Sequence, residues 1–158
     1  MSDGRRQIGA FQLPGDVLGL DASEVHRFTT EAPIDTTIRL VKRCNLERAA
    51  NVNAKVAHNL RLMTLGHLRH AEDHILLLGC KTAIERIASF LLEMDRRLPA
   101  TEMLALPMCR RDIGDYLGLT LETVSRSLSQ LRDQGVLEFS SARQIVLCNH
   151  RRLQILDA

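Results

Sequence analysis

The hydrophobic pattern of the N-terminal segment differs from that of the rest of the chain. Residues 7–20 alternate between apolar and polar types around a turn at Pro14-Gly15-Asp16, and residues 36–41 are rich in β-branched types. Both patterns predict short strands. So few strands cannot close a sheet by themselves. We therefore expect residues 1–44 to be part of a larger β domain.

The next segment has helical periodicity. From Leu46 to about Leu78 the sequence contains no proline and repeats apolar residues over more than one face of a helix. This pattern predicts one long helix with two buried sides. One stripe alternates spacings of four and three residues, as in the seam between two parallel helices. Its members are Ala57, Arg61, Thr64, Leu68, Ala71, Ile75 and Leu78. The stripe predicts a homodimer, and the alternative is burial of this face within a single chain.

A second helix is predicted from about Thr82 to Arg97, because apolar residues share one face there and Pro99 follows. Residues 99–107 are expected to be a linker.

Residues 110–128 have the spacing of a helix-turn-helix. Gly114 is small where two helices would cross, and Gly118 can adopt a positive φ at the turn. Thr120 is a suitable N-cap for the second helix, and Glu122 places a favourable charge in its first turn. The shared core is predicted to contain Ile113, Leu117, Leu119, Val124, Leu128 and Leu131.

Two short strands are predicted after the helix-turn-helix. Residues 135–139 and 144–147 have strand patterns, Ser140-Ser141-Ala142-Arg143 joins them, and residues 150–157 predict a terminal helix. A hairpin after a helix-turn-helix makes a winged helix, so the predicted fold class is α+β. Arg143 at the hairpin tip could meet a DNA phosphate, and the alternative is an ordinary exposed turn.

The second helix of the motif presents one polar face. Glu122, Ser125, Arg126 and Ser129 stand at positions i, i+3, i+4 and i+7. An Arg can bond guanine O6 and N7 together, a Glu can accept from a base amino group, and Ser serves several bases. We predict that Glu122, Ser125 and Arg126 contact bases. The alternative is a solvated face with an ordinary surface ion pair. Candidates for contacts to the DNA backbone are Arg110, Arg111, Thr120, Ser127, Ser129 and Arg143.

Composition limits the other classes of function. The 158 residues include 21 basic and 19 acidic ones, a balance unlike that of histone-like proteins. Aromatic residues make up only 3%, too few for the stacking surfaces that bind single-stranded nucleic acid. The longest apolar run, Ile75 to Leu78 with Gly79, is far shorter than the ~20 residues of a membrane helix. The N-terminus lacks the apolar core of a signal peptide. We expect a cytoplasmic protein that makes no membrane contact.

Few residues suggest other chemistry. His67, His70 and His74 share one side of the long helix, which favours a polar flank over a zinc site. The sequence has no nucleophile elbow, phosphate loop or H-E-x-x-H helix, so we expect no enzyme activity. The four cysteines form no C-x-x-C pair and are interpreted as reduced thiols.

Cys109 is a candidate for redox regulation. It precedes Arg110 and Arg111 at a predicted helix N-terminus, where exposed N–H groups and guanidinium charges favour the thiolate. Oxidation there would place a negative charge beside the DNA backbone. The alternative is an inert cysteine that packs with Met108.

The chain resembles the CRP/FNR superfamily of bacterial transcription regulators, and within it the FixK-like branch, over nearly all of its length. Residues 111–120 and 122–126 carry the most specific similarity, which continues through Gly15-Asp16, residues 75–78 and Glu85-Arg86. The resemblance implies a homodimer that binds double-stranded DNA at palindromes of TTGAT-type half-sites and activates transcription by touching RNA polymerase. The base-reading positions of the family fall on Glu122, Ser125 and Arg126.

The resemblance also implies three regions and no cofactor. Residues 1–44 would be a partial β-roll, 45–79 the dimerisation helix and 80–158 the winged-helix DNA-binding domain. Leu20 stands where cyclic-nucleotide binders carry a Glu, and Arg39 stands near the position of an iron–sulfur cysteine. We therefore expect neither ligand. The alternative function is a repressor or an architectural DNA-binding protein of the same fold.

Overall fold

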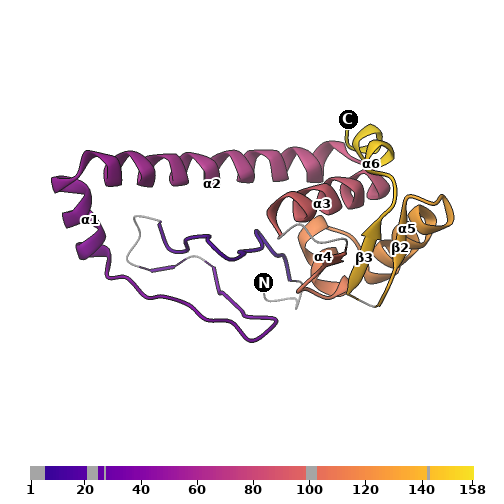
Figure 1. Cartoon of the computed structure of the whole chain (residues 1–158), viewed down its shortest axis with the longest axis horizontal. Coiled ribbons are helices and arrows are strands. Elements are labelled where there is room, and N and C mark those ends of the chain that lie inside the picture. The colour runs from indigo at the N-terminus through magenta and orange to yellow at the C-terminus, as the bar shows by residue number, and fades with distance from the viewer. Residues whose placement is uncertain (1–5, 21–24, 27, 99–102, 142) are drawn as a thin grey trace. The chain divides into compact units, whose positions relative to one another are not determined.

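The structure is a computed structural model of the chain (Figure 1), and it describes residues 6–20, 25–26, 28–98, 103–141 and 143–158. The elements in chain order are α1 (Arg43–Val52), α2 (Ala54–Cys80), α3 (Ala83–Arg97), β1 (Leu104–Ala105), α4 (Arg110–Leu117), α5 (Leu121–Asp133), β2 (Leu137–Phe139), β3 (Gln144–Leu147) and α6 (His150–Asp157). Helices with one small sheet confirm the predicted α+β class.

The chain separates into two compact units, here termed the C-terminal unit, made of Met1–Val17 with Leu76–Ala158, and the N-terminal unit, made of Leu18–Ile75. This division differs from the predicted boundaries, because the start of the chain groups with the C-terminal half. The physical reason is hydrophobic. Leu13 is buried in the core of the C-terminal unit, and Phe11 packs against that core.

The winged helix is confirmed, with one difference in its linker. The sheet has the antiparallel order β1-β3-β2, with Leu104 opposite Ile145 and Glu138 opposite Val146. Part of the predicted linker therefore forms strand β1, because Leu104 is buried and pairs with the hairpin. Residues 99–102 of that linker lie outside the described residues. The terminal helix α6 forms where the sequence predicts it.

The prediction of short strands in the N-terminal segment is wrong for the described residues. The described parts of 6–41 contain turns, bends and irregular backbone, and the first strand of the described chain is β1. A strand requires a ladder of hydrogen bonds to a partner. The Ile8 N–H instead donates to the Asp115 carbonyl (3.1 Å), and residues 36–41 are exposed to solvent.

The single helix predicted from Leu46 to Leu78 is divided at Asn53. Asn53 adopts an extended backbone, and its side-chain oxygen accepts from the N–H groups of Lys55 (3.0 Å) and Val56 (3.3 Å). An Asn that bonds the next amides ends one helix and caps the following one. The prediction that this helix has two buried sides is also wrong. Among the residues described in α2, only His74 is buried. No helix in the described parts of the chain is both long and apolar enough to cross a membrane.

The core of the C-terminal unit is organised around α3. A capping box between Thr82 and Glu85 begins the helix, and hydrogen bonds from Thr82 hold the pKa of Glu85 below its usual value. The buried face of α3 consists of Ile87, Ala88, Phe90, Leu91 and Met94. Tyr116 of α4 lies 6.0 Å from the Phe90 ring, measured between centroids.

Residues 6–16, here termed the N-terminal strap, pack against α3 and α4. The Phe11 ring lies 5.0 Å from the Tyr116 ring, and the Gln7 amide donates to the Tyr116 carbonyl (3.1 Å). Arg97 donates to the Phe11 carbonyl (2.9 Å) and pairs with Asp16 (2.7 Å). The strap therefore contributes both apolar and polar contacts to the C-terminal unit.

A half-buried polar network joins α3, α4 and the strap. The Tyr116 hydroxyl donates to Glu93 (3.2 Å), and Arg97 pairs with the other oxygen of Glu93 (2.6 Å). Burial, and then the Glu93 carboxylate, raise the pKa of Tyr116 above its usual range. The phenol therefore stays protonated and donates to Glu93.

Candidate nucleic-acid interface

The turn between α4 and α5 has the geometry that its sequence predicts. A Cβ on Gly114 would lie 2.6 Å from the Leu119 carbonyl oxygen, so only glycine fits this crossing. Gly118 has φ +64° and ends α4 in the left-handed conformation. The Thr120 hydroxyl then accepts from the Thr123 N–H (3.2 Å) and caps α5. Both glycine roles and the predicted N-cap are confirmed.

The two faces of α5 separate as predicted, except at one residue. Val124, Leu128 and Leu131 are buried, whereas Glu122 and Arg126 are exposed. Ser125 and Ser129 are half-buried. Ser127 is only 6% exposed and lies with the core residues, so it cannot reach a DNA phosphate. We remove Ser127 from the candidate backbone contacts.

Glu122 is held at the N-terminus of α5. Its own backbone N–H, then the Thr120 hydroxyl and finally the Arg111 charge lower the pKa of Glu122. The carboxylate is therefore ionised at neutral pH. An ionised carboxylate accepts hydrogen bonds and cannot donate them, so Glu122 can pair only with a hydrogen-bond donor.

Arg110 connects α4 to α5 and to the wing. Its guanidinium carbon lies 5.2 Å from the centre of the Phe139 ring of β2, and one nitrogen contacts the Ser125 hydroxyl at 3.5 Å. Ser125, a predicted base-reading residue, and Arg110, a predicted backbone contact, are thus brought together. The half-buried Arg110 therefore lies beside the Ser125 edge of the exposed face.

The N-terminus of α4 is stabilised by Asp112. Its carboxylate accepts from the Cys109 backbone N–H (3.0 Å) and pairs with Arg6 of the N-terminal strap (2.7 Å). Burial raises the pKa of Asp112, but hydrogen bonds from Arg6 and Cys109 outweigh it and leave this pKa lowered. Cys109 itself is half-buried beside the buried Met108, and Arg111 is exposed.

The remaining backbone candidates lie at the surface. Thr120 and Arg143 are exposed, and Arg143 follows the hairpin turn with its carbonyl accepting from Leu106 N–H (2.8 Å). Together with Arg111 and Arg126, Arg143 contributes a positive charge to the exposed part of the helix-turn-helix and wing.

The predicted dimer seam is exposed along α2. Leu68 is 54% and Ile75 68% exposed, and Arg61, Thr64 and Ala71 are also exposed. Burial of this stripe within the described chain, the alternative left open by the sequence, is therefore not observed.

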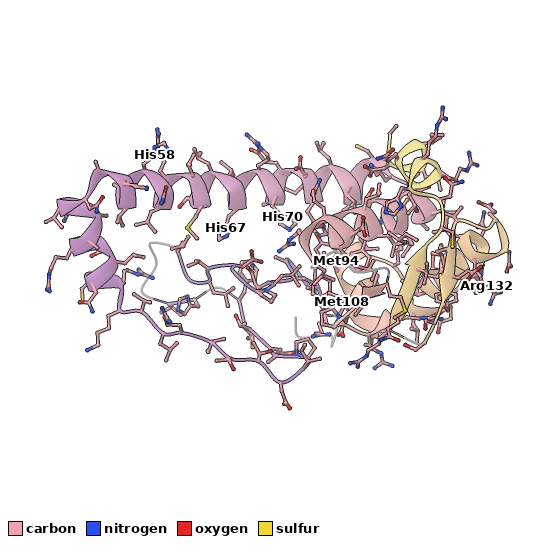
Figure 2. The ribbon with its side chains drawn as sticks, in the orientation of Figure 1. His58, His67, His70, Met94, Met108 and Arg132 are labelled. Atoms are coloured by element: carbon pink, nitrogen blue, oxygen red, sulfur yellow. The ribbon has the colours of Figure 1, made fainter. Side chains whose placement is uncertain are left out.

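The histidines of α2 form no metal centre in the described part of the chain. His67 and His70 project from one side of the helix and His58 from the other (Figure 2). The rings of His70 and His74 stack with 6.5 Å between their centres. Among the described residues, no three His, Cys, Asp or Glu side chains gather as metal ligands would.

Sequence reasoning missed two arginines that organise this region. Arg97 fastens the N-terminal strap, and Arg86 donates to backbone carbonyls of three different segments. The position of Arg86 in the sequence could have indicated this role. Arg86 follows the predicted helix start at Thr82 and directly precedes the apolar Ile87 and Ala88, a setting in which a long charged side chain must find buried acceptors.

Comparison with known proteins agrees with this geometry. Residues 85–156 match the model of the Crp-like helix-turn-helix domain. Two curated relatives are nitrogen fixation regulation proteins FixK, from Azorhizobium caulinodans (43% identical over 100% of this chain) and from Rhizobium meliloti (37% over 99%). The chain spans about two thirds of the length of these relatives, 66% and 71%.

A solved structure is similar over the whole chain. The structure of FixK2 from Bradyrhizobium japonicum has 68% sequence identity and a TM-score of 0.96, covering 100% of this chain and 80% of that one. A CooA mutant from Carboxydothermus hydrogenoformans, 24% identical with a TM-score of 0.65 over 73% of this chain and 55% of that one, shares the fold.

Proposed function

The chain belongs to the CRP/FNR family of DNA-binding transcription regulators, in its FixK-like branch, and is not an enzyme. From this premise we propose that it binds palindromic DNA with TTGAT-type half-sites as a homodimer. The observation that carries the proposal is the exposed face of α5, where Glu122, Ser125 and Arg126 surround the accessible side of a helix whose other side is buried. A helix of this kind can enter the major groove.

Each base-reading residue has a distinct role in the proposal. Arg126 donates two hydrogen bonds to one guanine, through O6 and N7. Glu122, ionised by its position at the helix N-terminus, accepts from cytosine N4 or adenine N6. Ser125, which Arg110 contacts, serves as a short donor or acceptor beside them.

The proposed phosphate contacts surround this face. Arg111, Thr120, Ser129 and Arg143 fix the depth and angle of α5 in the groove without reading sequence. Arg110 has a smaller share, because its guanidinium already stacks on Phe139.

The homodimer proposal rests on the exposed apolar stripe of α2. Covering Leu68 and Ile75 with the same residues of a second copy removes apolar surface from water. Two copies related by a two-fold axis would present their recognition helices about 34 Å apart, one turn of DNA. The proposed dimerisation region is residues 45–79.

We further propose that the bound dimer activates transcription through contact with RNA polymerase. The support is the naming of relatives. The FnrL protein of Cereibacter sphaeroides, 36% identical over 97% of this chain, is named a transcriptional activator protein. The alternative, repression or an architectural role, predicts no gain of transcript in a purified system with polymerase.

The proposal is tested by selecting bound sequences from random DNA duplexes. The expected product is a palindrome whose TTGAT-type half-sites are centred one helical turn apart. Arg126→Ala should lose the preference at one guanine per half-site, whereas Arg132→Ala, which removes the same charge at the other end of α5, should keep it. Recovery of asymmetric or random sequences by the wild type would refute the proposal.

A further inference from the structure

Arg86 joins three segments of the C-terminal unit through one guanidinium group. Its nitrogens donate to the carbonyls of Leu78 (2.8 Å), Lys81 (2.9 Å) and Leu117 (2.9 Å). Leu78 lies in the last turn of α2, Lys81 lies between α2 and α3, and Leu117 is the last residue of α4. The planar fork of an arginine can satisfy three such acceptors at once.

Two of these acceptors are helix C-termini. The last carbonyls of a helix have no partner within the helix and carry the negative end of its dipole. Arg86 supplies both the donors and the compensating positive charge to the ends of α2 and α4. The side chain is half-buried, so its hydrogen bonds are partly shielded from competing water.

The approach of α4 to this group is close. A Cβ on Gly118 would lie 3.5 Å from an Arg86 nitrogen and 3.4 Å from a methyl group of Leu78. Gly118 is also the left-handed residue that ends α4 and opens the turn to α5. The turn that sets the direction of the recognition helix therefore rests directly on Arg86 and the end of α2.

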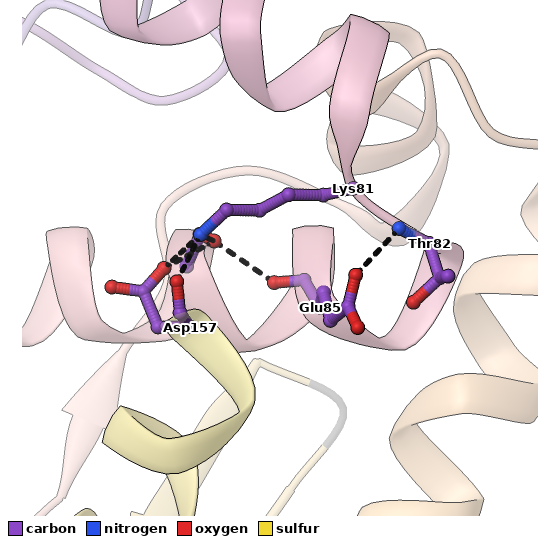
Figure 3. A network of polar contacts seen from close by, with 5 residues as sticks. Lys81, Thr82, Glu85 and Asp157 are labelled. Atoms are coloured by element: carbon purple, nitrogen blue, oxygen red, sulfur yellow. Dashed lines mark hydrogen bonds and ion pairs between the residues drawn. The ribbon is translucent and has the colours of Figure 1, made fainter.

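The connection between α2 and α3 is fixed independently by Lys81. Its ammonium group pairs with the Asp157 carboxylate of α6 (2.7 Å) and contacts the Asp157 carbonyl, as Figure 3 shows. It also donates to the Ser89 hydroxyl (3.1 Å). Thr82 and Glu85 cap α3 beside it. A change at Arg86 therefore leaves the Lys81 and Thr82 contacts of this connection in place and removes the hydrogen bonds of Arg86 itself.

We propose that Arg86 is a positioning residue that sets the angle of the helix-turn-helix relative to the end of α2, and through it the half-site spacing that the dimer accepts. The inference rests on the proposed dimeric function. The predicted dimer seam lies on α2, the helix whose last turn Arg86 contacts, so in the proposed dimer a change at this contact would alter the half-site spacing. A lysine keeps the charge at this position but cannot reach three carbonyls in different directions.

The test measures affinity of the full chain for four DNA duplexes: the selected palindrome, palindromes with one base pair added or removed at the centre, and a single half-site. One base pair rotates a half-site by about a tenth of a turn. Arg86→Lys and Arg86→Gln are compared with the wild type and with Arg96→Lys, an exposed arginine on the same helix.

In the Arg86 variants we expect about tenfold weaker binding to the selected palindrome, from the loss of one or two hydrogen bonds, with little change for the shifted palindromes and the half-site. The preference for one spacing should thus collapse, whereas Arg96→Lys should keep it. A ratio of affinities is unaffected by a fraction of unfolded protein, so a merely structural role predicts an unchanged ratio. Retention of the wild-type spacing preference by both Arg86 variants would overturn the inference. If the wild type itself bound the palindrome no better than the half-site, the proposed function would fail, and the inference with it.

Discussion

The substitution Gly114→Ala should destabilise the protein although alanine is the better helix former. The new Cβ would lie 2.6 Å from the Leu119 carbonyl oxygen, against about 3.3 Å for an ordinary carbon–oxygen contact. The obstructing atom belongs to the backbone, and the Leu119 N–H already donates to the Gly114 carbonyl (2.9 Å), so the turn must shift. Overpacking of this kind costs about 1–3 kcal/mol, and the helix propensity of alanine returns about 1 kcal/mol.

The expected net loss is thus up to about 2 kcal/mol in the free energy of unfolding, or a Tm lower by up to about 6 °C. Thermal unfolding followed by circular dichroism measures it. The matched control is Gly66→Ala, a helical glycine of α2 whose added Cβ meets nothing within 4 Å. That variant should be more stable than the wild type by about 0.5–1 kcal/mol. If both substitutions raise the Tm equally, the close crossing of α4 and α5 does not exist and our account of the turn is wrong.

The remaining predictions concern DNA binding, assembly and pH. Arg126→Ala should cost about 1–3 kcal/mol of discrimination at one guanine, seen by comparing affinities for cognate and substituted sites; equal losses on scrambled DNA would contradict the base contact. Leu68→Glu places like charges across the predicted seam and should sediment as a monomer, whereas an unchanged dimer would exclude this stripe as the interface. Peroxide should weaken DNA binding by the wild type but not by Cys109→Ser, and equal sensitivity would remove Cys109 as a redox switch. The pKa of Asp112 is lowered in the folded state, so its pairing with Arg6 stabilises the protein above the ordinary carboxyl pKa of about 4 and is lost as the pH falls below it. Asp112→Asn should therefore reduce stability at neutral pH and flatten the acid side of a pH–stability curve, and parallel curves would refute the pairing.

Local signals in the sequence were sufficient to predict the helix-turn-helix. Gly114, Gly118 and Thr120 each answer a constraint set by residues within a few positions: a close crossing, a left-handed turn and a helix cap. The exposed and buried faces of α5 follow from helical spacing for the same reason. The burial of Ser127 was not predicted, because its polar side chain suggested exposure. A serine is small enough to be buried at a core-facing position once its neighbours pack around it.

Contacts between distant segments could not be predicted in this way. The alternation of residues 7–20 is real, but its apolar positions, such as Phe11 and Leu13, pack against helices and not in a sheet. Periodicity describes which side of a segment is apolar and does not identify the surface that covers it. The interruption at Asn53 was accessible, since an Asn before a helical run is a strong N-cap, yet apolar periodicity on both sides of it suggested one continuous helix.

The N-terminal strap has a consequence for how the C-terminal unit folds. Arg6 and Asp112 are separated by 106 positions in the sequence, and Gln7 and Tyr116 by 109. Contacts between such distant residues form only after a large loss of chain entropy, whereas the helices around them form from near neighbours. During synthesis the strap also leaves the ribosome long before the surface that it covers. Docking of the strap is therefore a late folding step, and until it occurs the rings of Phe90 and Tyr116 lack the cover that Phe11 provides.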